Sequence, residues 1–238
     1  MTSSLIRLVP WDQDSPDHVE RLGQQRIACG WKVEKVPDWK RFQRDGKLAF
    51  YWITLAPEHA ERAHLLEQHW KEFPVEQKPL QNSCTQLMGS EYTADLATFH
   101  PVGHICLDGC VENHADNSLM ISPEDGVYAL AAFYISTALQ GSGIGREAMT
   151  LFEETAVAVH NATTITLDTL SNEDTCVGSP RMIALGRPVP KVPIVDWYQR
   201  RGYVVYDVVK DGVFDVDSTG KRWNSTLLYM KKDLTAGS

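Results

Sequence analysis

The sequence has few features of an exported or membrane-bound protein. A membrane-spanning helix needs about 20 consecutive apolar residues, and no run among the 238 residues approaches that length. The amino-terminal stretch MTSSLIRLVP lacks the basic start and the apolar centre of a secretion signal. We therefore expect a cytosolic or nuclear chain, assign it to the cytoplasm, and expect no membrane partner.

Cysteine is scarce, and its spacing excludes a disulfide framework. The five cysteines are odd in number, are scattered and include no CxxC pair, which fits a reducing compartment. Histidines and cysteines gather in FHPVGHICLDGCVENH, residues 99–114. Their spacing matches no zinc signature, so core cysteines and loop histidines explain them better than a metal site. We expect no bound metal.

Positive charge is also in short supply. The chain has 23 Lys and Arg against 31 Asp and Glu, a net charge of −8. Because a nucleic-acid-binding protein usually displays a basic face, we expect no nucleic-acid partner. The negative charge favours cationic or neutral partners through long-range attraction, although the need for solubility alone also explains it.

The composition that remains is that of a globular protein, 43% apolar and 23% charged. Its length suits one large domain over residues 1–238, and the alternation of apolar runs and amphipathic stripes indicates a mixed sheet with helices between strands. Strands are expected at 5–9, 47–57, 100–108, 127–135, 163–170, 203–209 and 223–234. Helices are expected at 15–29, 36–45, 57–73, 144–159 and 195–201, and irregular chain at 74–95 and 171–195.

A buried strand, a glycine-rich turn and an amphipathic helix follow one another over residues 127–159. The run VYALAAFYI is nearly all apolar, which is typical of a central strand buried on both faces. The glycine-rich turn QGSGIGR comes next, at 140–146. The helix after it is expected to bury one stripe, at Ile144, Ala148, Leu151, Phe152, Thr155 and Val159, with Arg146, Glu147, Thr150, Glu153 and Glu154 opposite.

The turn has the chemistry of a phosphate site. A helix start exposes up to four N–H groups without intrahelical partners, together with a partial positive charge, and this combination binds phosphate. Gly141, Gly143 and Gly145 let main-chain amides approach an anion closely, since no Cβ stands in the way. Arg146 adds a positive charge. We expect a ligand that carries phosphate.

Other interpretations of the same glycines stay open. The P-loop pattern GxxxxGK[ST] is absent. A dinucleotide fingerprint GxGxxG would need glycine at Arg146, although Asp168 stands about where a ribose-binding acid belongs. A strand-to-helix turn that binds nothing also explains such a pattern when it occurs alone.

Two segments together resemble a known family. FYISTALQGSGIGREAM resembles motif A of the GNAT acetyltransferase superfamily, Q/R-x-x-G-x-G/A, and Thr137 stands where the family usually has a proline. DWYQRRGYVVYD resembles motif B. The matching residues are Gln140, Gly141, Gly143, Ile144 and Gly145 in motif A, and Trp197, Tyr198, Gly202 and Tyr203 in motif B. The resemblance covers residues 101–231, and the segments at 30–46 and 167–171 resemble uncharacterised fungal members.

The resemblance implies a fold and a co-substrate. The fold is α/β, with a central mixed, mostly antiparallel twisted sheet of six to seven strands flanked by helices, and with insertions at the N-terminus and at 171–195. The co-substrate is acetyl-CoA, whose pantetheine arm pairs with the backbone of Phe133 and Ile135, with Asn172 as a further contact. Its diphosphate lies on Gln140, Gly141, Ser142, Gly143, Ile144, Gly145 and Arg146.

The resemblance also implies a reaction. A primary amine of a small molecule or peptide attacks the thioester directly in a ternary complex. Tyr198 occupies the position of the general acid, and Glu124, just before the central strand, is the candidate base. A homodimer is compatible with the family. Two alternatives remain: a non-catalytic acyl-CoA-binding module of the same fold, and an NAD-dependent oxidoreductase that uses the same glycines.

Overall fold

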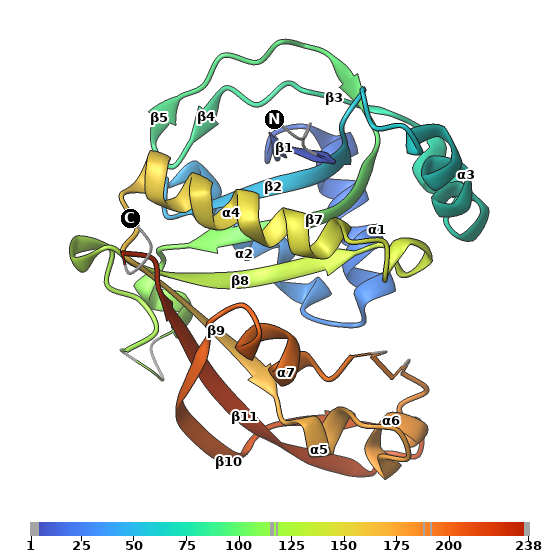
Figure 1. The fold of residues 1–238 in the computed structure, drawn as a ribbon, viewed down its shortest axis with the longest axis vertical. Coiled ribbons are helices and arrows are strands. Elements are labelled where there is room, and N and C mark those ends of the chain that lie inside the picture. The colour runs from blue at the N-terminus through green and yellow to red at the C-terminus, as the bar shows by residue number, and fades with distance from the viewer. Residues whose placement is uncertain (1–4, 115–116, 118, 188, 191, 236–238) are drawn as a thin grey trace. The chain divides into compact units, whose positions relative to one another are not determined.

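A seven-stranded sheet organises the chain (Figure 1). The computed structural model describes residues 5–114, 117, 119–187, 189–190 and 192–235. In sheet order the strands are β1 (Ile6–Pro10), β2 (Leu48–Leu55), β7 (Pro101–Asp108), β8 (Val127–Ile135), β9 (Thr164–Leu170), β11 (Arg222–Asp233) and β10 (Val204–Val216). The sheet is mostly antiparallel, with β8 and β9 parallel. The expected mixed α/β fold is confirmed. Within the described residues, no helix is long and apolar enough to cross a membrane.

The chain divides into two compact units that share β8. The first comprises Met1–Ala115 and Leu130–Asn161, and the second comprises Asp116–Ala129 and Ala162–Ser238. Each unit has a cluster of buried apolar side chains of its own. The expectation of a single domain over residues 1–238 therefore stays a prediction.

In the first unit, helices cover both faces of the strands. Every residue of β2 and β7 is buried, as expected for strands enclosed on both sides. Helix α4 (Ile144–His160) packs against β1 and β7, and it lies in front of them in Figure 1. Helices α1 (Pro16–Cys29) and α2 (Val36–Arg44) lie behind, where Trp11, Trp39, Phe50 and Trp52 form an aromatic core.

The segment between β2 and β7 holds a helix and small pieces of strand. Helix α3 (Arg62–Glu72) begins five residues later than the sequence suggests, because a turn occupies the residues after Pro57. A 3₁₀ turn, η2 (Pro74–Gln77), follows it. The pieces are β3 (Leu80–Gln81) paired with β6 (Thr98–Phe99), and β4 (Gln86–Leu87) paired with β5 (Ser90–Glu91).

The buried stripe of α4 differs from the expected one. Ile144, Ala148 and Phe152 are buried as predicted, but Val159 is 59% exposed. Met149, Glu153 and Ala156 complete the buried face instead. The expected placement of Glu153 on the solvent side was therefore wrong. The mistake came from extending one register along 16 residues, in which a 3.6-residue period admits more than one apolar stripe.

In the second unit, a long hairpin packs beside β9. Strands β10 and β11 pair antiparallel, and β11 pairs with β9 from Leu227↔Leu170 to Asp233↔Thr164. The segment expected to be irregular contains two short helices, α5 (Asn172–Thr175) and α6 (Pro180–Ala184). Asp215 of β10 accepts hydrogen bonds from Arg181 and Arg187, so this segment is tied to the hairpin. Helix α7 (Ile194–Gln199) packs on β9.

Candidate functional site

The carboxyl end of β8 is fixed against β7 by a close backbone contact. A Cβ on Gly103 would stand 2.2 Å from the carbonyl oxygen of Tyr134, so only glycine fits there. The Ser136 N–H donates to the Val102 carbonyl at 2.9 Å. Tyr134 and Ser136 thus direct their peptide groups toward β7. Since successive peptide groups alternate along a strand, those of Phe133 and Ile135 point the opposite way, away from β7.

The start of α4 lies directly over the end of β8. A Cβ on Gly145 would lie 3.6 Å from Ile135 Cγ1 and 3.7 Å from Phe133 Cζ. The side chains of Phe133 and Ile135 therefore face α4. The small Gly145 lets the first turn of the helix approach the strand at ordinary contact distance.

The glycine loop (residues 136–146) turns the chain from β8 into α4. It contains a 3₁₀ turn, η5 (Thr137–Leu139), followed by Gly141 at φ 95° and Gly143 at φ 92°. These are left-handed conformations that residues with a Cβ rarely adopt. A Cβ at Gly141 would meet nothing within 4 Å. The glycine there is required by the backbone conformation rather than by lack of space.

The loop presents four main-chain donors close together. Among the described residues, no hydrogen bond engages the N–H groups of Gly141, Gly143, Ile144 or Gly145. The N–H of Ser142, between Gly141 and Gly143 in the sequence, is occupied because it donates to the Leu139 carbonyl at 3.3 Å. The amino-terminal residue of α4 is capped by no side chain. Four such donors at a helix start form a ready site for an anion.

The polar side chains of the loop support its shape. Gln140 Nε2 donates to the Ile135 carbonyl at 3.3 Å, and Ser142 Oγ donates to the Leu139 carbonyl at 2.7 Å. Arg146 is exposed in the first turn of α4. The structure therefore brings together Phe133, Ile135 and the whole 140–146 segment in one unit.

Tyr198 lies on α7, in the second unit. Its ring packs edge-to-face on Trp197 and Tyr203, with ring centroids 5.1 and 5.5 Å away. Burial, with a smaller contribution from the nearby Asp168 carboxylate, raises the pKa of the Tyr198 phenol above its ordinary value. The phenol stays protonated at neutral pH, which is the state that a proton donor requires.

Asn172 also belongs to the second unit. Its Nδ2 donates to Asp196 Oδ1 at 2.7 Å, and its Oδ1 accepts from the Val195 N–H at 3.3 Å. Both ends of the amide thus hold the first turn of α7, the helix that carries Tyr198. The expected contact of Asn172 with pantetheine stays a prediction.

Glu124 lies in an exposed 3₁₀ turn, η4 (Pro123–Asp125), before the amino end of β8. The glycine loop follows the other end of the same strand. The expected role of Glu124 as a base stays a prediction.

The segment that holds the strand, loop and helix also matches a known family. Residues 61–177 match the model of the Acetyltransferase (GNAT) family. The chain carries a GNAT-family domain. The match extends from α3 through the glycine loop to β9 and α5, so it contains the four loop donors. The resemblance inferred from QGSGIG is confirmed, while DWYQRRGY, residues 196–203, lies outside the matched residues.

Solved structures share the fold of this GNAT domain at low sequence identity. NAA60 of Arabidopsis thaliana, in complex with a bisubstrate analogue, has a TM-score of 0.53 at 8% identity, over 96% of this chain and 98% of that one. A spermidine N-acetyltransferase SpeG chimera from Vibrio cholerae and hSSAT has a TM-score of 0.51 at 11% identity, over 98% of this chain and 97% of that one. No curated protein matches the sequence at a significant level. At these identities the likeness shows the fold alone.

Sequence reasoning missed the side chains that support the loop of the GNAT domain. His69 Nδ1 lies 2.9 Å from Ser136 Oγ, and Thr137 Oγ1 donates to Glu72. Both partners come from α3, more than 60 residues earlier in the chain. Only the presence of Thr137 in place of the usual proline hinted that this part of the loop differs.

Proposed function

We propose that this protein is an N-acetyltransferase that moves the acetyl group of acetyl-CoA to a primary amine of a small molecule or peptide, by direct attack in a ternary complex. The observation that carries the proposal is the set of four main-chain donors at Gly141, Gly143, Ile144 and Gly145. Membership of an acetyltransferase family supports it.

The four donors are the binding site for the diphosphate of acetyl-CoA. An anion there receives hydrogen bonds from amides that are already aligned, at the positive end of the α4 dipole. Arg146, one turn into the helix, adds a full positive charge close to the same place. Asp and Glu are absent from residues 140–146, so no carboxylate of the loop opposes the anion.

The pantetheine arm runs back along β8 from the loop. Phe133 and Ile135 direct their peptide groups away from β7, so these are the groups that face the arm. The thioester oxygen gains negative charge when the amine attacks, and a main-chain N–H stabilises such an oxyanion. The backbone direction favours the N–H of Phe133 for this role over that of Tyr134, whose peptide groups face β7.

Proton transfer completes the reaction. The amine attacks in its neutral form, the C–S bond of the tetrahedral intermediate breaks, and the thiolate of coenzyme A takes a proton. Tyr198 is the proposed donor, because it stands at the position of the general acid in the motif that the sequence resembles and its phenol is protonated at neutral pH. The proton lost by the amine passes to Glu124, the candidate base, or to water. The net charge of −8 favours amines, which are cationic before they react.

Calorimetry followed by turnover assays tests the proposal. Acetyl-CoA, desulfo-coenzyme A and NAD are titrated into the protein. Thiol release is then measured with spermidine, an aminoglycoside, a lysine peptide and a peptide with a free amino terminus. Binding of both coenzyme A compounds with thiol release for at least one amine supports the transferase. Binding without release for any amine points to an acyl-CoA-binding module, and binding of NAD alone points to an oxidoreductase.

A further inference from the structure

We infer that α3 is a positioning element for the glycine loop, and that side-chain hydrogen bonds from His69 and Glu72 take the place of the proline that GNAT members usually carry at Thr137. The inference rests on the proposed function for the identity of the ligand, acetyl-CoA. Its structural content, the ordering of the loop by α3, stands on the contacts alone.

The loop begins with a sharp change of direction. Ser136 has φ −42° and ψ 128°, and the 3₁₀ turn at Thr137–Leu139 follows at once. Farther on, Gly141 and Gly143 hold left-handed conformations, and glycine loses more conformational freedom on ordering than any other residue. A loop of this kind needs external support if its four donors are to be aligned before a ligand arrives.

The support at Ser136 comes from a buried chain of polar side chains. His69 is fully buried, with Nδ1 2.9 Å from Ser136 Oγ and Nε2 3.4 Å from Glu76 Oε2. Glu76 is 1% exposed; its Oε2 accepts from Gln25 Nε2 at 2.7 Å and lies 3.9 Å from Arg21. His69 Nε2 makes no hydrogen bond within the described residues but lies beside the Glu76 carboxylate. With the proton on this nitrogen, Nδ1 accepts from the Ser136 hydroxyl.

The support at Thr137 comes from the last turn of the same helix. Thr137 Oγ1 donates to the carboxylate of Glu72, three residues after His69. Residues three apart lie on one face of a helix. One face of α3 therefore contacts two successive loop residues, and it fixes their separation and direction.

A proline at position 137 would produce a similar restraint by covalent means. Proline fixes φ near −65°, which suits the first residue of a 3₁₀ turn. It also prefers an extended residue before it, and the ψ of 128° at Ser136 meets that preference. The hydrogen bonds from α3 thus achieve with side chains what the ring achieves in the family pattern.

Pre-organising a loop raises affinity, because less freedom is lost on binding. Loss of one supporting hydrogen bond, about 1 kcal/mol, corresponds to about a fivefold weaker affinity for coenzyme A. The turnover number should change little, since neither His69 nor Glu72 is placed at the thioester. Loss of the support from α3 should therefore weaken coenzyme A binding and leave the turnover number nearly unchanged.

The test compares Thr137→Ala with Thr137→Pro. Both remove the hydroxyl, but only the proline restores the restraint. The dissociation constant for desulfo-coenzyme A should rise about fivefold in Thr137→Ala and stay near the wild-type value in Thr137→Pro. Equal weakening in both variants, or no weakening in Thr137→Ala, overturns the inference.

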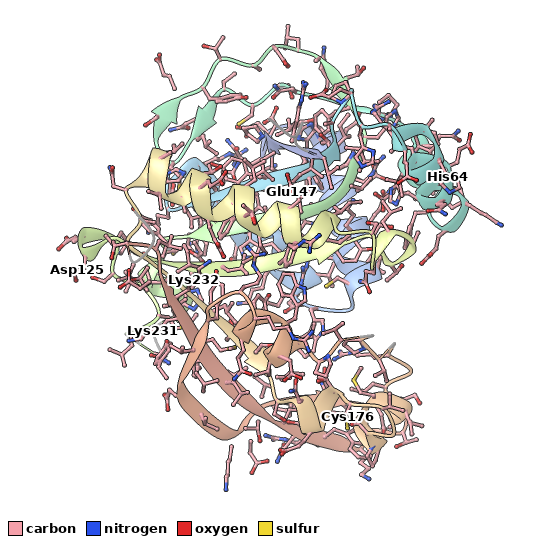
Figure 2. All side chains as sticks on the ribbon, in the orientation of Figure 1. His64, Asp125, Glu147, Cys176, Lys231 and Lys232 are labelled. Carbon is pink, nitrogen blue, oxygen red and sulfur yellow. The ribbon has the colours of Figure 1, made fainter. Side chains whose placement is uncertain are left out.

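A second pair of variants tests the buried part of the chain. His69→Gln should weaken desulfo-coenzyme A binding while the turnover number is retained. His64→Gln, on the exposed face of the same helix (Figure 2), should change neither. If the His69→Gln variant unfolds, Ser136→Ala is used in its place, because it removes the same hydrogen bond by deleting a single oxygen.

Hydrogen exchange separates this inference from the proposed function. The Leu139 and Ser142 amides are hydrogen-bonded within the loop, and their exchange can be followed without any ligand. Exchange should be faster in Thr137→Ala than in wild type, and restored in Thr137→Pro. If exchange changes in this way but the wild-type protein binds no coenzyme A, the proposed function is contradicted and the positioning role of α3 is upheld. Unchanged exchange in Thr137→Ala overturns the role whatever the ligand.

Discussion

The carbonyl oxygen of Tyr134 occupies the position that a side chain on Gly103 would need. A Cβ there would stand 2.2 Å from the oxygen and 3.1 Å from the carbonyl carbon. Both atoms are backbone, so neither can rotate away. The contact sets the direction of the last peptide groups of β8, and therefore determines which of them face the proposed co-substrate.

Gly103→Ala should destabilise the protein strongly, by about 2–4 kcal/mol, because the strands must separate to admit the methyl group. Gly23→Ala is the matched control, since a Cβ at Gly23 meets nothing within 4 Å inside α1; it should stabilise by about 0.5–1 kcal/mol. Urea unfolding of both variants measures the difference. A Gly103→Ala variant as stable as wild type would show that β7 and β8 do not approach so closely.

Gly141→Ala should weaken acetyl-CoA binding by about tenfold, or about 1.4 kcal/mol, by distorting the loop donors. Gly220→Ala is the control. Both glycines have φ between 85° and 95°, and a Cβ at either would meet nothing within 4 Å. Each substitution should cost about 1–2 kcal/mol of stability, but only the first should alter binding in calorimetry. Equal affinities would remove the glycine loop from the site.

Tyr198→Phe should lower the turnover number by about 100-fold, the usual contribution of a general acid, with little change in the affinity for acetyl-CoA. Tyr206→Phe, which removes the hydroxyl of another tyrosine in the second unit, should leave turnover intact. Thiol release under saturating substrates measures both. Normal turnover in Tyr198→Phe would assign the ring to packing alone.

His104 should remain neutral at a pH where histidines of the unfolded chain are protonated. Burial, together with the Arg26 guanidinium, holds the pKa of His104 well below its ordinary value. Arg26 can only donate, so Nε2 at 3.2 Å must accept, and Nδ1 then donates to Gln25 at 2.9 Å.

The consequence is a loss of stability in acid. A histidine whose pKa is lower in the folded state than in the unfolded state makes its full contribution to stability above the unfolded pKa of about 6.5. That contribution is lost as the pH falls below this value. The free energy of unfolding should therefore be smaller at pH 5.5 than at pH 7.5. Imidazole NMR signals of labelled histidine check the cause directly; a His104 resonance that titrates near pH 6.5 would contradict it.

Local features of this fold are readable from the sequence, and distant pairings are not. The central strand at 127–135 and the turn at Gly141 and Gly143 appear where expected, because apolar composition and backbone freedom act within a few residues. The contact of His69 with Ser136 joins residues 67 apart in the sequence, and no local sequence pattern predicts it. Glu153 was misplaced because a helix stripe was extended beyond its first two turns.

The roles of the candidate side chains divide in the same way. The loop amides follow from glycine spacing and a helix start. Burial of the Tyr198 ring depends on Trp197, Tyr203 and the strand beneath them, and it emerges only once the chain has folded. The amide of Asn172 hydrogen-bonds Val195 and Asp196, a structural role that the sequence did not indicate, and its expected contact with the co-substrate stays a prediction. An Asn in a turn can have several structural roles, and the sequence alone seldom shows which of them it has.

The central claim is that the main-chain amides of the glycine loop bind a diphosphate, and an NMR titration of ¹⁵N-labelled protein with coenzyme A tests it most directly. The account predicts large, saturating shifts of the Gly141, Gly143, Ile144 and Gly145 amide signals, with smaller ones at Ser142, whose N–H is already occupied. Amide signals of these four residues that do not move at millimolar coenzyme A would contradict the account.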